Sequence, residues 1–299
     1  MIEIKNISKT FGDLKVLEEL NCTIKDNCIY GLVGANGSGK STLLRLINGI
    51  FYPDEGEITV DNEIPFENEK IKQNMVFVPD DLHFYPAYTL EDMASFYKAM
   101  YKKFDKEYLY DLARKLKLDT SRKISSFSKG MKRQCALILA LATRCKYMFF
   151  DETFDGLDPV IRNFFKKQIA KQMEEEHSTI IMTSHNLREL EDICDNLGLL
   201  YKGGILFESD IDSIKTNMYK VQISLKEEDF DEKSFIGIKI LSFKKVGSVA
   251  CMIIEDKDGK IRNQLEKMNP LILDFLPLTL EEMFIYEMEA LGYEFNEIL

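Results

Sequence analysis

The stretch "GANGSGKST", residues 34–42, has the spacing G-x-x-x-x-G-K-[ST]. In a loop of this kind, successive backbone N–H groups point inward and surround a phosphate, and the start of the next helix adds its positive end. An apolar run, "CIYGLV", precedes the loop, and the helical pattern "KSTLLRLINGI" follows it. We therefore predict a nucleotide phosphate loop here and not a flexible surface turn, with Lys40 at the β- and γ-phosphates and the Ser41 hydroxyl on Mg²⁺.

Two carboxylates end another apolar run, "YMFFDE", at Asp151 and Glu152. At the end of a buried strand, Asp151 is placed to hold Mg²⁺ through water. Glu152 points elsewhere, because strand side chains alternate, and can take a proton from an attacking water. A third apolar run, "TIIMTSH", ends at His185, which by itself would be read as a histidine bonded to backbone.

Buried strands that alternate with helical patterns predict a mostly parallel α/β sheet up to about residue 210. Beyond that point the pattern changes to shorter strands, "YKVQISL", "IGIKILSF" and "SVACMIIED", with two helical stretches. The second stretch begins at Thr279, with Glu282 three residues later as a capping box. We expect a domain boundary at about residues 210–218.

The composition is that of an ordinary globular chain: 299 residues, of which 45% are hydrophobic and 30% charged. The net charge of −11 argues against a protein that follows nucleic-acid phosphates. No run approaches the roughly 18 apolar residues of a membrane helix, and the charged start does not fit a signal peptide. The six cysteines include no C-x-x-C pair, and buried thiols in the cytoplasm are the expected state.

Several motifs occur in one order along the chain: "GANGSGKST", "VFVPD" (76–80), "FSKGM" (127–131), "YMFFDE", "FDGLDP" (154–159) and "TSHNL" (183–187). Over roughly residues 2–210 the chain resembles the ATP-binding subunits of ABC transporters. The resemblance implies a P-loop ABC ATPase domain over residues 1–214, with a RecA-like parallel sheet, an antiparallel β-subdomain and a helical subdomain at about 82–142. A small α+β accessory domain would occupy residues 215–299.

The resemblance also assigns roles by position, with ATP and Mg²⁺ as cofactors. Phe11 would stack on adenine, and Val16 would lie beside the nucleotide. Asp151 would bind Mg²⁺, Glu152 would act as general base, and His185 would bond the γ-phosphate. The phosphates would be held by the loop residues Gly34, Ala35, Asn36, Gly37, Ser38, Gly39, Lys40, Ser41 and Thr42.

Two such subunits would enclose two ATP molecules head to tail. Ser128, Lys129 and Gly130 of one subunit would meet ATP held by the other, and Asp158 would carry contacts across the interface. Ser128 and Gly130 at a helix start also make an anion site on physical grounds. We expect the neighbouring Lys132, Arg133 and Gln134 to be ordinary helix surface or dimer rim.

Four positions depart from the usual family pattern: Asp80, Lys129, Met131 and Thr153 stand where glutamine, glycine, glutamine and proline are common. The Asp80 carboxylate could still approach Mg²⁺, directly or through water. Lys129 either approaches the γ-phosphate in trans or faces solvent. Because Lys40, Asp151, Glu152 and His185 are all present, we predict an active ATPase.

"SKGM" and the ending "PLTLEEMFIYEM" resemble ATPases paired with ABC-2-type membrane subunits, which are mostly exporters. The expected partners are a second ATPase subunit, identical or closely related, and a separate transmembrane permease, with Tyr85 and Tyr88 as candidate contacts. The chain itself is expected in the cytoplasm, peripheral on the inner face of the cell membrane. The alternative is a soluble ABC-type ATPase acting on ribosomes or DNA. Neither the tandem cassettes nor the coiled-coil insertions of such proteins are present. A P-loop kinase does not explain the "FSKGM", "FDGLDP" and "TSHNL" positions.

Overall fold

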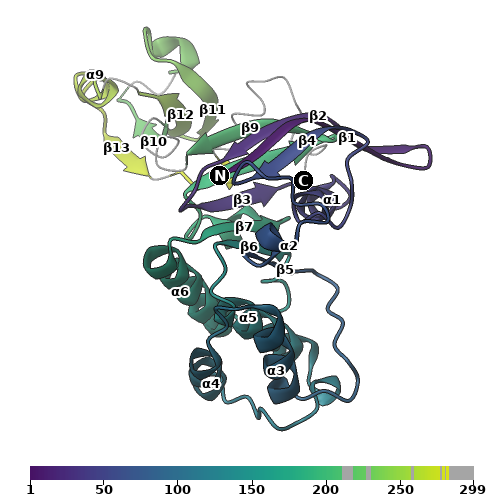
Figure 1. Ribbon diagram of the computed structural model, residues 1–299. Helices are drawn as coiled ribbons and strands as arrows, with labels where there is room; N and C mark the ends of the chain where they lie inside the picture. Colours follow the sequence, from purple (N-terminus) through teal and green to yellow (C-terminus); the bar gives the residue numbers. More distant parts are fainter. Residues whose placement is uncertain (211–217, 227–229, 257–258, 277, 280, 283–299) are drawn as a thin grey trace. The chain divides into compact units, whose positions relative to one another are not determined.

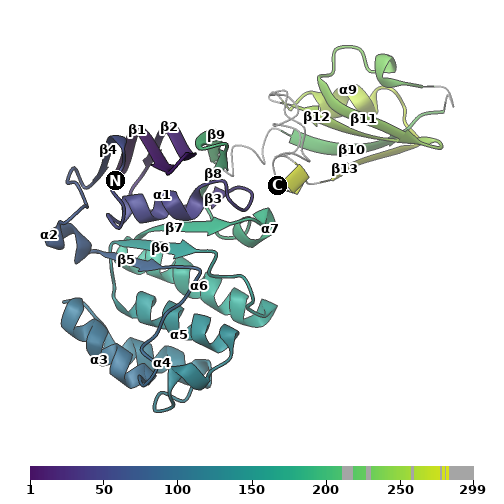
Figure 2. The same ribbon diagram turned by 90° about the vertical axis from the view of Figure 1, so that its right-hand side faces the viewer.

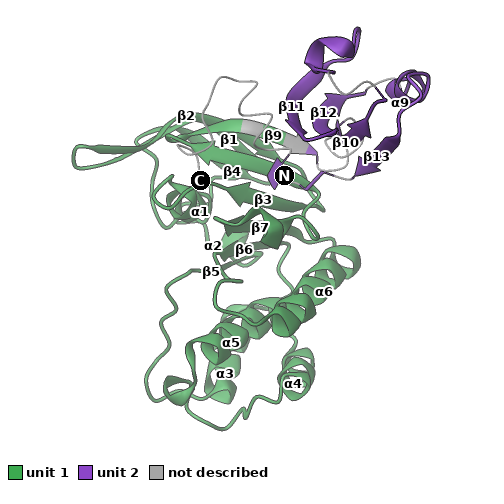
Figure 3. Cartoon of the chain, turned by 180° about the vertical axis from the view of Figure 1, so that it is seen from behind, with its two compact units in different colours: residues 1–208 green, residues 209–299 purple. Residues whose placement is uncertain are grey.

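The chain forms two compact units, residues 1–208 and 209–299, in a computed structural model (Figure 3). The structure describes residues 1–210, 218–226, 230–256, 259–276, 278–279 and 281–282. The two units meet in sequence between Glu208 and Ser209. The pattern of residues predicted a boundary at about residues 210–218, and the resemblance implied domains over residues 1–214 and 215–299. The sheets and the core of each unit are separate from those of the other, so each unit is described by itself.

A six-stranded sheet in the order β5-β6-β7-β3-β8-β9 forms the centre of unit 1 (Figure 1). Neighbouring strands from β5 to β8 pair in parallel. All residues of β3, β6 and β7 are buried, as expected for apolar strands covered on both faces. The strand bounds are β3 (Ile29–Val33), β5 (Met75–Val78), β6 (Tyr147–Asp151), β7 (Thr179–Ser184), β8 (Asn196–Tyr201) and β9 (Gly204–Asp210).

Helix α1 (Lys40–Ile47) and helix α6 (Pro159–Glu176) lie on opposite faces of this sheet (Figure 2). On the α1 side, β1 (Ile2–Phe11), β2 (Leu14–Ile24) and β4 (Glu55–Val60) form an antiparallel sheet in the order β2-β1-β4. One buried cluster joins both sheets to α1; its members include Ile2, Leu17, Leu44 and Phe149. The phosphate loop therefore starts from a strand and ends in a helix that share one core.

The helical part of unit 1 follows β5. Its elements are α3 (Leu90–Met100), α4 (Lys106–Lys115), the 3₁₀ turn η1 (Ile124–Ser126) and α5 (Lys129–Ala142). Two shorter helices of unit 1 lie outside this part: α2 (Glu69–Lys72) before β5, and α7 (Leu187–Leu190) after β7. Thr89 and Asp92 form a reciprocal capping box at the start of α3. The second half of α5, Cys135 to Ala142, is buried throughout, which anchors this helix against the rest of unit 1.

Unit 2 has a four-stranded sheet in the order β11-β12-β10-β13. The pairs β11-β12, β10-β12 and β10-β13 are all antiparallel. Its core includes Val221, Ile223, Phe235, Met252 and Leu265. The elements are β10 (Met218–Ser224), the 3₁₀ turn η2 (Glu232–Ser234), β11 (Ile240–Val246), β12 (Val249–Glu255), α9 (Ile261–Glu266) and β13 (Ile272–Leu276).

Two details of unit 2 bear on the sequence predictions. The strand expected from Ile236 begins only at Ile240, because residues 236–237 form a turn after η2. The capping box is confirmed: the Thr279 N–H donates to the Glu282 carboxylate, and the Glu282 N–H donates to Thr279 Oγ1. The remainder of the predicted final helix lies outside the described residues.

The predicted fold class is confirmed: a parallel α/β sheet, an antiparallel sheet, a helical segment and a small α+β unit are all present. Within the part of the chain that the structure describes, no helix is long and apolar enough to cross a membrane.

Candidate functional site

The phosphate loop connects β3 to α1, and its glycines are required by its geometry. Gly39 has φ +108, and a Cβ there would lie 2.8 Å from Leu17 Cδ2 and 3.1 Å from the Val16 carbonyl oxygen. A Cβ at Gly34 would meet the Leu200 carbonyl oxygen at 2.5 Å. The backbone therefore runs so close to β2 and β8 that only glycine fits at these two positions.

Lys40 is 5% exposed at the start of α1. Its Nζ donates to the carbonyl oxygens of Gly34, at 2.6 Å, and Ala35, at 3.2 Å, so the ammonium lies over the loop. The residue before it, Gly39, gives α1 no side-chain cap. A positive charge and the start of an eight-residue helix thus converge on the loop, the arrangement that binds a phosphate.

Asp151 ends β6 and is 1% exposed. Its Oδ1 accepts a hydrogen bond from Thr183 Oγ1 at 2.7 Å. Burial raises the pKa of this carboxyl, and the neighbouring Thr183 and Ser41 hydroxyls oppose that rise. Among the described residues, its buried Oδ2 has no hydrogen-bond partner.

Glu152 joins the other two predicted catalytic residues. Its Oε1 lies 3.2 Å from Lys40 Nζ, and its Oε2 lies 2.9 Å from His185 Nδ1. The backbone N–H of His185 also donates to Oε2, at 3.3 Å. The first residue of α1 and the residues that directly follow β6 and β7 therefore meet at the carboxyl end of the parallel strands, where ligands of open α/β sheets bind.

The residues present fit ATP with a magnesium ion. An unpartnered, buried carboxylate oxygen of Asp151 beside the Ser41 hydroxyl offers the hard oxygen ligands that Mg²⁺ prefers. Ser38 Oγ, in the loop itself, is also buried without a hydrogen-bond partner among the described residues. These groups lie where phosphate oxygens and their cation would satisfy them.

Asp80, predicted as a further magnesium ligand, has a different partner. Its Oδ1 accepts a hydrogen bond from the Arg133 guanidinium at 2.7 Å. Arg133 is 2% exposed, so the expectation that it lies on the helix surface or dimer rim was wrong. One signal was available, because Arg133 lies four and eight residues before the buried Leu137 and Leu141, on the same face of α5. The magnesium role of Asp80 stays a prediction.

The predicted adenine-side residues lie near the turn between β1 and β2. Phe11 is 43% exposed, and its ring is 5.4 Å from that of Phe51, edge to face. Val16 packs against the core that supports α1, and its carbonyl oxygen faces Gly39. In the loop, Asn36 and Gly37 are exposed, whereas Ala35 and Thr42 are half-buried.

The "FSKGM" segment begins α5. Ser128 caps this helix by accepting a hydrogen bond from the Met131 N–H at 3.2 Å. Lys129 is exposed, with Nζ 3.9 Å from Asp155, and a Cβ on Gly130 would lie 3.5 Å from the Gly156 carbonyl oxygen. Within the described residues, the side-chain bonds of Ser128 and Lys129 thus go to their own helix and to Asp155, not to the phosphate loop.

Asp158 begins the next helix. Its carboxylate caps α6 by accepting hydrogen bonds from the N–H groups of Val160 and Ile161, both at 3.0 Å. The segment from Glu152 to Asp158 thus connects the carboxylate predicted as the general base directly to a capped helix.

Comparison with known proteins agrees with this geometry. The family model described as "ABC transporter" matches residues 17–155. The chain is 31% identical over 288 residues to the ABC transporter ATP-binding protein YtrB of Bacillus subtilis (strain 168), covering 95% of this chain and 97% of YtrB. A solved structure of an ATP-binding subunit of an ABC transporter superimposes with a TM-score of 0.67 at 25% identity, over 72% of this chain and 92% of that one.

Two further relatives match about two thirds of the chain. The linearmycin resistance ATP-binding protein LnrL of Bacillus subtilis (strain 168) is 34% identical, over 69% of this chain and 68% of LnrL. The methionine import ATP-binding protein MetN of Clostridium tetani (strain Massachusetts / E88) is 32% identical, over 67% of this chain and 66% of MetN. The fold and site define a P-loop ATPase. More particularly, the chain belongs to the ATP-binding subunits of ABC transporters.

The buried Asp151 carboxylate generates a prediction about stability. Its pKa is higher in the folded chain than in the unfolded chain, so its ionisation costs stability above the ordinary aspartate pKa. Asp151→Asn removes that charge and keeps an acceptor for Thr183. We expect its thermal midpoint at pH 7, without nucleotide, to rise by about 2–4 °C, and Mg²⁺-dependent ATP hydrolysis to be lost.

The gain in thermal midpoint should shrink as the pH falls. It should disappear below about pH 3.9, where the Asp151 carboxyl is protonated in both the folded and the unfolded chain. Asp111→Asn, on the exposed face of α4, is the control and should not raise the midpoint, since Asp111 forms ion pairs with Arg114 and Lys115. A midpoint of Asp151→Asn equal to or below that of the wild type would contradict this account of the buried charge.

Proposed function

We propose that this chain hydrolyses ATP between two ATPase subunits and uses the closure of that dimer to drive export through a separate membrane subunit. The observation that carries the proposal is the contact of Lys40, Glu152 and His185 at the end of the sheet, beside the buried Asp151. Phosphoryl transfer needs mainly positioning and charge neutralisation, and these residues supply both.

Each residue has a distinct role in the proposed reaction. Lys40 neutralises the β- and γ-phosphates, and the loop N–H groups hold them in place. The Glu152 carboxylate accepts a proton from the attacking water. His185, held through Nδ1 by Glu152, bonds the γ-phosphate. Ser41 and Asp151 would hold Mg²⁺, which supplies further positive charge on the phosphates when bound.

The second subunit, identical or closely related, completes each site. Lys129 is 75% exposed in its side chain, at the start of α5, and is free to approach an anion held by another copy. Ser128, Gly130 and Asp158 lie at or next to helix starts, which favour negative charge. A site shared by two chains makes hydrolysis conditional on closure, so closure can do mechanical work.

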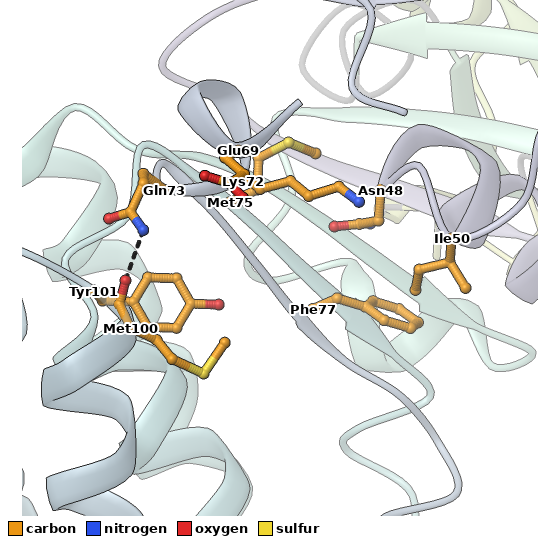
Figure 4. A pocket seen from close by; sticks show the side chains of 9 residues that line it. All are labelled: Asn48, Ile50, Glu69, Lys72, Gln73, Met75, Phe77, Met100 and Tyr101. Atoms are coloured by element: carbon orange, nitrogen blue, oxygen red, sulfur yellow. Dashed lines mark hydrogen bonds between the residues drawn. The ribbon is translucent and has the colours of Figure 1, made fainter. Parts of the chain in front are cut away.

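A groove in unit 1 is the proposed contact with the membrane subunit. It has a volume of about 440 Å³, and its lining is mostly apolar (Figure 4). Its apolar residues are Ile50, Met75, Phe77, Met100 and Tyr101, and Glu69 and Lys72 are charged residues in the same lining. The Gln73 amide donates to the Met100 carbonyl oxygen at 2.7 Å and joins α2 to α3 across the groove.

Exposed apolar side chains continue from this groove along α3. Phe96 and Met100 are one helical turn apart, and both are exposed. The Tyr85 ring lies 6.1 Å from Phe96 and 4.8 Å from Tyr88, so the two tyrosines proposed as partner contacts extend the same strip. An amphipathic helix from the membrane subunit, with its apolar face in the groove, fits this surface. The chain would then lie peripherally at the cytoplasmic face of the membrane.

Glu152→Gln tests the proposed chemistry. We expect ATP turnover to fall by about 10²-fold or more, because the amide cannot take a proton from water, while ATP binding is retained. The readouts are phosphate release and equilibrium binding of a labelled ATP on the full chain. Glu175→Gln, on the exposed face of α6, is the matched control and should keep wild-type turnover. Equal turnover for Glu152→Gln and the wild type would exclude Glu152 as the base.

Charged substitutions test the groove. Ile50 and Met100 are 51% and 46% exposed, so Ile50→Glu and Met100→Glu should leave the fold intact. We expect each to abolish co-purification of the membrane subunit with the tagged chain from detergent-solubilised membranes, while Val246→Glu in unit 2 leaves it unchanged. Recovery of ribosomes in place of a membrane protein would support the alternative function. Unchanged recovery of the membrane subunit with Ile50→Glu and Met100→Glu would show that the groove is not the contact surface.

Transport in inside-out membrane vesicles tests the direction. The vesicles would be incubated with culture-medium extract and ATP, and their contents compared by mass spectrometry. Export predicts solutes that accumulate inside with the wild-type chain and not with Glu152→Gln. An ATP-dependent loss of solutes from preloaded vesicles would show import, as the name of MetN states for that relative.

A further inference from the structure

Arg133 is the largest of the side chains that are almost fully buried in the described part of the chain, and it is charged. It extends from α5 to three groups. One guanidinium nitrogen donates to the main-chain carbonyl oxygen of Glu152, and the other lies 2.7 Å from Asp80 Oδ1 and 3.6 Å from Asp155 Oδ2. A buried charge of this kind is costly unless it is paired, so its position calls for a reason.

The contact with Glu152 is to the backbone and not to the carboxylate. Glu152 has φ +48, a left-handed conformation that costs a residue other than glycine about 1–2 kcal/mol. Both main-chain hydrogen-bonding groups of the residue are held: its N–H donates to Thr183 Oγ1 at 3.0 Å, and its carbonyl accepts from Arg133 and, at 3.3 Å, from the Asp155 N–H. The strained turn is thus fixed from β7 on one side and from α5 on the other.

The direction of the Glu152 side chain follows from that turn. Since β6 ends at Asp151, an extended Glu152 would continue the alternation of the strand. In the left-handed conformation its carboxylate instead lies 3.2 Å from Lys40 Nζ and 2.9 Å from His185 Nδ1. A group that fixes the Glu152 main chain therefore also keeps the Glu152 carboxylate in contact with Lys40 and His185.

Asp80 and Asp155 supply the charge that balances Arg133. Their side chains are 55% and 50% exposed, so each remains hydrated on one side while Arg133 is 2% exposed. Asp80 lies two residues beyond the end of β5 and is the nearer of the two. Its hydrogen bond orients the guanidinium fork so that the other nitrogen meets the Glu152 carbonyl.

We propose that Arg133 is a positioning residue for ATP hydrolysis, which holds the Glu152 peptide in its left-handed turn, and that Asp80 orients Arg133. This inference rests on the proposed role of Glu152 as general base. It gives the aspartate at the usual glutamine position a function within the chain. Because Arg133 belongs to α5, the orientation of the Glu152 carboxylate would also depend on how α5 packs against the sheet.

The test compares single and double variants of the full chain. We expect Arg133→Gln to lower kcat by about tenfold, equivalent to about 1.4 kcal/mol, with KM and labelled-ATP affinity within about twofold of wild type, because the phosphate loop is untouched. Arg133→Lys should recover part of kcat by keeping a charged donor. Asp80→Asn should lower kcat by less than Arg133→Gln does. Arg114→Gln, an exposed arginine on α4, is the matched control.

Non-additivity separates positioning from general damage. If Arg133 acts through Glu152, the Glu152→Gln and Arg133→Gln/Glu152→Gln proteins should have the same residual turnover. Wild-type kcat for Arg133→Gln, a KM that rises in proportion to any loss of kcat, or a further tenfold loss in the double variant would each overturn the proposal.

The same variants distinguish a failure of the proposed role of Arg133 from a failure of the proposed role of Glu152. Should Arg133→Gln fail to fold, Asp80→Asn decides. The Asp80 side chain is 55% exposed, and the Asp155 carboxylate, 3.6 Å from Arg133, still balances the buried charge. Wild-type kcat for that variant then counts against the proposal. Wild-type turnover for Glu152→Gln would show that Glu152 is not the general base, and the inference about Arg133 would then fail with the proposed function. Inactive Glu152→Gln beside fully active Arg133→Gln rejects only the role of Arg133.

Discussion

The ion pair between Lys40 and Glu152 is the interaction on which the site depends. Its atoms lie 3.2 Å apart, and both side chains are largely buried. A buried pair is worth keeping only when its geometry is good and its remaining atoms are bonded. Lys40 donates to two loop carbonyls, and Glu152 Oε2 contacts His185. The buried Glu152 Oε1 has no hydrogen-bond partner among the described residues, and its contact with Lys40 is the ion pair. The phosphate loop and the end of β6 are therefore held together as one unit.

The packing around this pair explains why the two sheets and α1 share one core. Apolar residues of β1, β2 and β4 cover one side of α1, and those of β3 and β6 cover the other. The resulting close approach leaves no room for a Cβ at Gly34 or Gly39. Interiors packed at this density resist small shifts, so the phosphate loop is preorganised for its ligand.

Strain and buried charge gather around one residue, Glu152. Its left-handed backbone, the burial of the Arg133 charge that holds its carbonyl and the raised pKa of the preceding Asp151 all cost stability. Strained residues and perturbed carboxyls collect where chemistry is done. The surrounding core, including β6 and β7, in which every residue is buried, supplies the stability that sustains them.

The role of His185 was assigned by the family resemblance. The sequence by itself determined the phosphate loop, the carboxylates Asp151 and Glu152, and the parallel sheet that brings them together. These features follow from local spacing, and the carboxyl ends of parallel strands necessarily meet at one edge. Only the tertiary structure decided the partners of Asp80 and Arg133, the turn at Glu152 and the apolar groove. Asp80 and Arg133 are 53 residues apart, and no local pattern states which distant side chain a charge will meet. Packing selects that partner, because a guanidinium enclosed by the core must find its carboxylate and its carbonyl within reach.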